Sequence, residues 1–145
     1  MIAVDTNILV YSSDKNTEWH SRAADLIGRL WADDSPWAIP WPCVHEFYSV
    51  ITNPKIFKAP ATPAEASFQI ETWMKSRSLI LLGEQRGYWP VLANLIASSM
   101  IRGAQIHDAR IAALCLSNGV KELWTADRDF QRFPALRTRN PLIQR

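Results

Sequence analysis

Short apolar runs alternate along this chain with longer segments in which apolar residues recur at helical spacing. A run of three or four apolar residues is long enough for a strand but too short for a helix. We predict strands at residues 2–4, 38–40, 79–82 and 123–125, the first and third of them buried. We predict helices at residues 8–11, 19–31, 42–53, 63–76, 88–101 and 108–116. This alternation predicts an α/β fold with a mostly parallel sheet and right-handed crossovers.

The length and the apolar pattern of the chain indicate its number of domains and its cellular compartment. A chain of 145 residues fits one domain over 1–145, and no linker or internal repeat divides it. No apolar run approaches the ~20 residues of a membrane helix, and the first five residues lack the basic and apolar regions of a signal peptide. Cys43 and Cys115 are expected to be buried thiols in a reducing cytoplasm, although the sequence alone leaves a disulfide open. We therefore expect a cytoplasmic protein without a membrane partner.

Positive charge gathers towards the C-terminus, although the net charge of the chain is only +2. Five arginines there face a single acid, Asp129: Arg128, Arg132, Arg137, Arg139 and Arg145. Such a region can neutralise phosphates or pair with an acidic partner. Charge alone favours the simpler alternative of an ordinary solvated surface.

Two acids follow predicted strands at the point where each strand ends. Asp5 comes directly after residues 2–4, and Asp127 closely follows residues 123–125. In open α/β sheets, ligands bind beyond the carboxyl ends of the strands, so both acids are expected at one edge of the sheet. Either acid taken alone can equally be the cap of a helix or a turn.

Two further acids lie on predicted helices. Asp108 shares a helical face with the apolar Ile111 and Cys115, where a buried carboxylate is costly unless something compensates for it. Stabilisation by the amides at the helix N-terminus is an equally good explanation. Glu46 falls opposite the apolar face of its helix, where a solvated glutamate is the simpler interpretation. Its place early in a helix that follows a strand can still direct it towards the same edge.

Acids gathered at one edge favour a hard cation. They repel each other unless a cation joins them, and an all-oxygen site suits Mg²⁺ or Mn²⁺, which can activate water and stabilise charge on a phosphate. Zinc is not expected, because His20, His45 and His107 are single and no cysteine–histidine spacing fits. The chain has no glycine-rich nucleotide-binding loop. A phosphoaspartyl phosphatase is excluded because it needs a second aspartate two residues after the first, where this chain has Asn7. No lysine follows residues 123–125, as a receiver domain would require.

Four segments together resemble the PIN-domain nucleases: VDTNIL at 4–9, Glu46, HDARIAA at 107–113 and TADRDF at 125–130. Their order and the size of the chain are similar to those of the VapC toxins of bacterial toxin–antitoxin pairs, and the likeness covers essentially the whole chain. The resemblance implies a three-layer α/β/α sandwich with a mostly parallel central sheet. It also implies an endoribonuclease that hydrolyses RNA phosphodiester bonds with Mg²⁺ or Mn²⁺.

The resemblance further implies a role for each matching residue. The acidic quartet would be Asp5, Glu46, Asp108 and Asp127. The metal ligands among them would be Asp5, Asp108 and Asp127, with Glu46 completing the site directly or through water. Thr6 and Thr125 match supporting hydroxyl positions, and Asp129 matches a second acid that either binds metal or caps the turn.

The resemblance also implies partners. They are an RNA substrate, a cognate antitoxin that occupies the active-site groove, and a second copy of the chain in a homodimer. Arg110 and Arg128 flank two of the acids and can hold substrate phosphates or form plain ion pairs. Two alternatives stay open: a housekeeping PIN nuclease in RNA processing, and a non-catalytic module of the same fold that binds RNA or protein. The sequence names neither the target RNA nor the number of metal ions.

Overall fold

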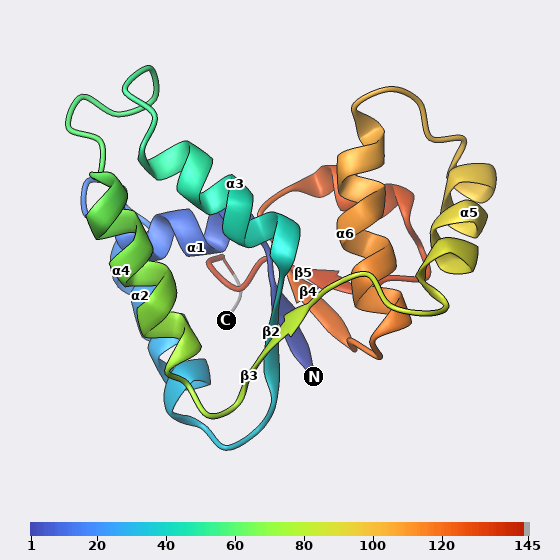
Figure 1. Ribbon diagram of the computed structural model, residues 1–145, viewed down its shortest axis with the longest axis horizontal. Coiled ribbons are helices and arrows are strands. Elements are labelled where there is room, and N and C mark those ends of the chain that lie inside the picture. The colour runs from blue at the N-terminus through green and yellow to red at the C-terminus, as the bar shows by residue number, and fades with distance from the viewer. Residues whose placement is uncertain (144–145) are drawn as a thin grey trace.

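A parallel sheet of five strands forms the centre of the computed structural model, which describes residues 1–143 (Figure 1). The strands are β1 (Ile2–Val4), β2 (Trp37–Pro40), β3 (Leu79–Leu82), β4 (Glu122–Trp124) and β5 (Thr138–Arg139). Their order across the sheet is β3-β2-β1-β4-β5. β1 lies between β2 and β4, and Val4 is paired with Trp124. The carboxyl ends of β1 and β4 therefore meet at the same edge.

Helices cover both faces of this sheet. They are α1 (Thr6–Ser13), α2 (His20–Ala32), α3 (Trp41–Ile51), α4 (Pro63–Met74), α5 (Tyr88–Ser99), α6 (Gln105–Ser117) and the 3₁₀ helix η1 (Arg128–Arg132). In Figure 1, α1 to α4 lie on one side of the strands, and α5 and α6 lie on the other. The expected α/β fold with three layers is confirmed, and every strand pairing in the sheet is parallel.

The core consists of the apolar runs and the inward faces of the helices. Ala3, Val4, Ile39 and Leu123 on the central strands are fully buried, as expected for strands covered on both faces. In α6 every residue from Ala109 to Cys115 other than Arg110 is buried, so this helix lies deep against the sheet. Its burial fixes the direction of the first turn, where Asp108 lies.

Local signals in the sequence set several helix ends. Thr62 caps α4: its hydroxyl accepts from the Glu65 backbone N–H at 3.1 Å, and the Glu65 carboxylate accepts from the Thr62 N–H at 2.9 Å. α5 ends at Ser99 and is followed by its C-cap, Met100, which adopts a left-handed backbone conformation with φ of 51°. α6 begins at Gln105, three residues before the predicted start, so Asp108 lies within its first turn rather than at its head.

One prediction about the strands was wrong, and one strand was missed. β3 is an edge strand rather than a buried one, and the side chain of Ile80 is 44% exposed. β5 was not predicted, because its two residues, Thr138 and Arg139, form no apolar run. Both errors concern the outer strands of the sheet. An outer strand is only partly covered, so its apolar content does not tell whether it is buried or whether it exists.

Two smaller findings concern the rest of the chain. Cys43 and Cys115 are both buried and both free thiols. Within residues 1–143, no helix is long and apolar enough to cross a membrane. Arg145, the last of the C-terminal arginines, lies outside the described residues.

Candidate functional site

A pocket of about 270 Å³ opens at the carboxyl edge of the sheet. All four predicted acids line it: Asp5, Glu46, Asp108 and Asp127. They come from four separate places in the fold, namely the end of β1, α3, the first turn of α6 and the segment before η1. The structure therefore brings together the acids that the sequence placed at one edge.

Asp5 lies at the bottom of this pocket with only 4% of its surface exposed. Its Oδ1 accepts from the Thr6 backbone N–H at 2.8 Å, and its Oδ2 accepts from the Thr125 hydroxyl at 2.7 Å. The Cys43 thiol lies 3.5 Å from Oδ1 and can donate weakly. Burial raises the pKa of Asp5 to about 6, even though these hydrogen bonds favour the charged form.

Asn7 and Thr125 tie Asp5 to the loop after β4. The Asn7 side-chain amide donates to Asp5 Oδ2 and to Thr125 Oγ1, both at 3.3 Å, and its Oδ1 accepts from the Ala126 N–H at 3.0 Å. The Thr125 hydroxyl also accepts from the Asp127 N–H at 3.0 Å. Sequence reasoning missed the part that Asn7 plays. Its position two residues after Asp5, on the first turn of α1, was the available signal.

Thr6 and Glu46 form a second hydrogen-bonded pair in the pocket. The Thr6 hydroxyl donates to Glu46 Oε2 at 3.0 Å. Glu46 is exposed on α3, opposite the buried Val44 and Phe47, as its place in the helical pattern indicated. Its exposure does not remove it from the site, because the open mouth of the pocket is itself solvated.

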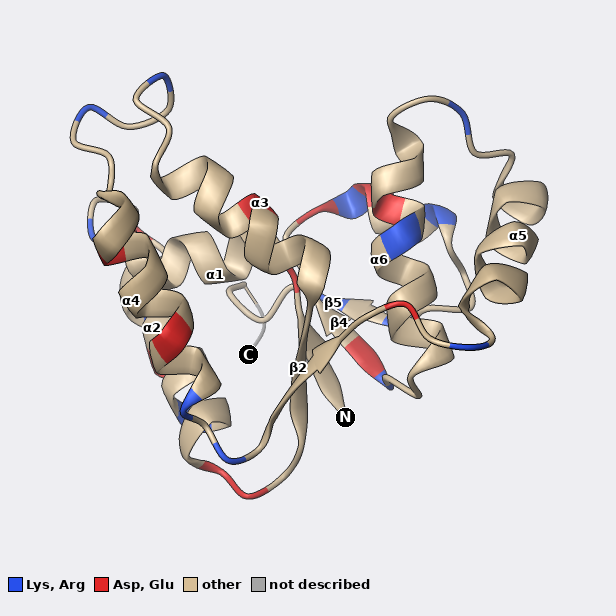
Figure 2. Ribbon diagram, in the orientation of Figure 1, with Lys and Arg blue, Asp and Glu red and all other residues tan. Residues whose placement is uncertain are grey.

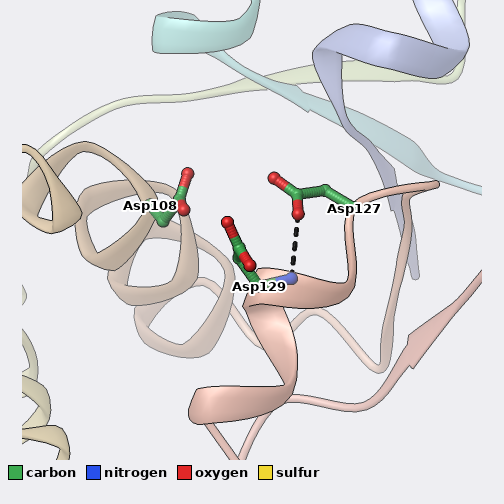
Figure 3. Close-up of side chains that lie close together, drawn as sticks. All are labelled: Asp108, Asp127 and Asp129. Carbon is green, nitrogen blue, oxygen red and sulfur yellow. Dashed lines mark hydrogen bonds between the residues drawn. The ribbon is translucent and has the colours of Figure 1, made fainter.

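Asp108, Asp127 and Asp129 form the tightest group of carboxylates, and Figure 3 shows their side chains gathered between α6 and η1. One oxygen from each lies within 4.8 Å of the others. Asp127 also caps η1, because its Oδ1 accepts from the Asp129 N–H at 2.8 Å. Burial raises the pKa of Asp108, the charges of Asp127 and Asp129 raise it further, and Arg132 opposes them.

This group suits a hard divalent cation. Around Mg²⁺, whose bonds are about 2.1 Å, neighbouring ligand oxygens lie about 3 Å apart and opposite ones about 4.2 Å. The three carboxylates, whose oxygens lie within 4.8 Å of one another, would therefore draw together by about 1 Å around an ion. Asp5 was expected to be a ligand, but it lies in the same pocket outside this tight group. The carboxylate of Asp129, whose role the sequence left open, lies inside the group.

The arginines near the acids have different surroundings. Arg110 Nε lies 2.6 Å from Glu84 Oε1, so this arginine forms an ion pair with a residue outside the acidic group. Arg128 is exposed on η1 and has no ion-pair partner among residues 1–143. Of the two arginines considered from the sequence, Arg128 is the one available to a ligand.

Comparisons with known proteins identify the family and the fold of this chain. A sequence model of the family described as PIN domain matches residues 2–136. Ribonuclease VapC48 of Mycobacterium tuberculosis is 30% identical over 94% of this chain and 94% of its own length. Ribonuclease VapC43 of the same organism is 32% identical over 98% of this chain and 96% of its own length. A crystal structure of VapBC2 from Rickettsia felis, bound to a DNA fragment from their promoter, has a TM-score of 0.62 and 19% identity, and covers 96% of this chain and 98% of that chain. At that identity the likeness shows the fold.

Proposed function

The chain belongs to the PIN-domain family, and we propose that it is a metal-dependent endoribonuclease, the toxin of a toxin–antitoxin pair. The observation that carries this proposal is the convergence of four acids from distant segments on one pocket. Phosphodiester hydrolysis needs relief of charge at the phosphate and a water that can lose a proton, and such a pocket suits both needs. The ribonuclease names of the curated relatives support the choice of RNA.

We propose Mg²⁺ or Mn²⁺ as the cofactor, because the donor set consists of oxygens. Asp108, Asp127 and Asp129 would hold the ion, with Asp5 and Glu46 completing the site from the same pocket. Bound there, the ion would supply positive charge against the charge that builds up on the phosphodiester, and it would favour ionisation of water.

The residues around the acids would fix them before substrate arrives. Asn7 and Thr125 hold the Asp5 carboxylate, so little reorganisation is needed during the reaction. Thr6 occupies Glu46 Oε2, which leaves Oε1 to accept a proton from the attacking water. The oxygen of that water bonds to phosphorus, the bond from phosphorus to the leaving ribose oxygen breaks, and the leaving oxygen takes up a proton from solvent.

The proposed partners follow from the family and from the surface. We propose a cognate antitoxin, because VapBC2 was crystallised as a complex named for two components. We propose a homodimer, because large apolar side chains such as Phe68 on α4, 66% exposed, remain on the surface. Residues 1–145 would act as one domain in the cytoplasm, where RNA and a protein antitoxin meet.

Cleavage of total cellular RNA by the purified chain tests the enzyme. We expect cleavage with Mn²⁺ or Mg²⁺, none in EDTA, and a loss on the order of 100-fold or more in Asp108→Asn. Asp25→Asn is the matched control, because Asp25 lies on α2 with its side chain 58% exposed and forms an ion pair only with Arg29. Folded protein, purified free of any bound protein, that cuts no RNA with either metal but holds RNA equally well in EDTA would make the chain a binding module instead.

A further inference from the structure

We propose that a second pocket beside the acids holds a phosphate of the RNA substrate through Arg128 and Arg139. This pocket, here called the arginine pocket, has a volume of about 480 Å³ and lies between η1 and the segment that contains β5. Asp127 lines both the arginine pocket and the acidic pocket, so the two adjoin. The proposal rests on the proposed ribonuclease function and adds the place where the uncut part of the strand binds.

Arg139 is the first observation that points to a ligand. Its Nε is buried and has no hydrogen-bond partner in the structure, and no ion pair involves this residue among residues 1–143. A buried donor of this kind is rare, because an unsatisfied polar group destabilises the fold. A guanidinium group presents donors in a planar fork that matches the oxygens of a phosphate.

The neighbours of Arg139 supply further donors. Arg128 lines the same pocket, is exposed, and has no ion-pair partner among the described residues. Asn140 also lines it, and its Oδ1 accepts from the Leu142 N–H at 3.0 Å, which leaves its side-chain NH₂ group for a ligand. Two positive charges and an amide donor outweigh the one carboxylate that lines this pocket, that of Asp127, and so favour an anion with several oxygens over a neutral ligand.

The position of the pocket identifies that anion. Figure 2 shows acidic and basic segments side by side where η1 meets α6. The acidic pocket repels any phosphate that has no cation beside it, so the phosphates that flank the scissile one need positive charge elsewhere. The arginine pocket adjoins the acids and offers this charge, and within residues 1–143 no carboxylate forms an ion pair with either arginine. Contacts to phosphates fix the position of a nucleic acid strand, so the pocket would align the scissile bond with the acids.

Binding of RNA in EDTA tests the pocket independently of cleavage. The probe is a fluorescein-labelled single-stranded oligoribonucleotide of mixed sequence, measured by fluorescence anisotropy over a range of salt concentrations. We expect Arg128→Ala and Arg139→Gln each to weaken binding about tenfold, since each removes a charge-assisted hydrogen bond. We also expect the slope of log affinity against log salt to fall in magnitude by about 0.7 for each phosphate that the variant no longer neutralises.

Arg77→Ala is the matched control, because the Arg77 side chain is 92% exposed and lies just before β3, at the opposite end of the strands. It should change neither the affinity nor the salt slope beyond the general effect of one charge. Arg128→Ala removes an exposed side chain and should leave the fold intact, so the test stays valid if Arg139→Gln does not fold. Thermal melting checks whether each variant is folded. With metal present, Arg128→Ala should raise KM by a larger factor than it lowers kcat, because the side chain binds and aligns the strand without touching the reacting atoms; a merely structural defect would not give this pattern.

The outcomes separate this proposal from the proposed function. The arginine pocket would be disproved, and the nuclease left intact, if the wild type cleaves RNA but the double variant Arg128→Ala/Arg139→Gln keeps the affinity and salt slope of Arg77→Ala. Absence of wild-type cleavage, together with the expected weakening of binding in the variants, would disprove the nuclease and keep the pocket as an RNA-binding site. A wild-type chain that binds the probe no better than the double variant would overturn the proposal.

Discussion

Asp5 carries a conflict between stability and function at a single residue. Its carboxylate is buried at the end of β1, and burial raises its pKa from an ordinary 3.8 to about 6. Below about pH 3 the group is neutral in the folded and the unfolded chain alike. As the pH rises from there to about 6, the unfolded state loses its proton first, so ionisation favours unfolding. Above pH 6 the full penalty is present, and the shift corresponds to roughly 3 kcal/mol.

We therefore predict that Asp5→Asn stabilises the metal-free protein at neutral pH. The expected gain in the free energy of unfolding is about 1–2 kcal/mol at pH 7.5, less than the full penalty because the new amide group replaces one acceptor with a donor. At pH 4 most of the gain should be lost, because Asp5 is then almost entirely neutral in the folded chain. Urea unfolding in EDTA at the two pH values measures it, with Asp25→Asn as the control. A gain of the same size at both pH values would contradict the argument.

Asn7 illustrates what residue patterns can and cannot predict about the site. Three of the four acids were found because they follow strands or share an apolar helical face, and these signals are local, whereas Glu46 was identified through the family resemblance. The bonds of Asn7 to Thr125 and Ala126 depend on the pairing of β1 with β4, which joins segments far apart in the chain. The sequence shows only that Asn7 lies two residues after Asp5, and it does not show the bridge that Asn7 forms between two strand ends.

At the scale of elements, the central strands were easier to predict than the outer ones. β1, β2 and β4 lie within the sheet and carry apolar runs that their burial requires. β3 has an equally apolar run but lies at the edge, because strand order depends on the crossovers and not on composition. β5 is the opposite case: it has no apolar run and exists because Leu123 and Trp124 of β4 offer it a pairing edge.

The C-terminus of α5 offers a test of backbone strain. Met100 caps this helix with φ of 51° and its side chain is 70% exposed, so it holds a left-handed conformation without burying much apolar surface. A left-handed conformation costs a residue with a Cβ about 1–2 kcal/mol, and glycine adopts it freely. We predict that Met100→Gly stabilises the protein by about 0.5–1 kcal/mol, after the greater freedom of glycine in the unfolded chain is subtracted.

The control for this prediction is a second substitution to glycine, placed one turn earlier in the helix. Ala97 is exposed in the interior of α5, so Ala97→Gly should destabilise the protein by about 1 kcal/mol. The midpoints of urea unfolding compare the two variants with the parent chain. A drop in stability in Met100→Gly similar to that in Ala97→Gly would show that Met100 contributes through its side chain and not through strain.

At the scale of the whole molecule, the site is a product of topology. The four acids are spread along most of the chain and meet because β1 and β4 are parallel neighbours and α3 and α6 lie on opposite sides of them (Figure 1). Sequence reasoning could place strand-end acids at one edge, because that follows from parallel pairing alone. It could not decide that Asp129 rather than Asp5 lies within 4.8 Å of Asp108 and Asp127, because this depends on how η1 turns.

A site shared among distant segments ties metal binding to the stability of the whole fold. The acids are brought together only in the folded chain, so a cation that binds them stabilises the native state. We predict that Mn²⁺ at about 100 times its Kd stabilises the protein by about 2.7 kcal/mol, which raises the Tm by about 5–10 °C for a chain of this size. Asp108→Asn should lose most of this increase, and Asp25→Asn should keep it.

The same increase should depend on pH in a defined direction. The pKa of Asp5 is raised to about 6 and that of Asp108 is also raised, so protons compete with the cation for these carboxylates at acidic pH. The gain in Tm caused by Mn²⁺ should therefore be larger at pH 7.5 than at pH 5.5. Differential scanning fluorimetry with matched ionic strength and an EDTA control measures both values. An increase that is equal at the two pH values, or unchanged in Asp108→Asn, would place the cation somewhere other than this pocket.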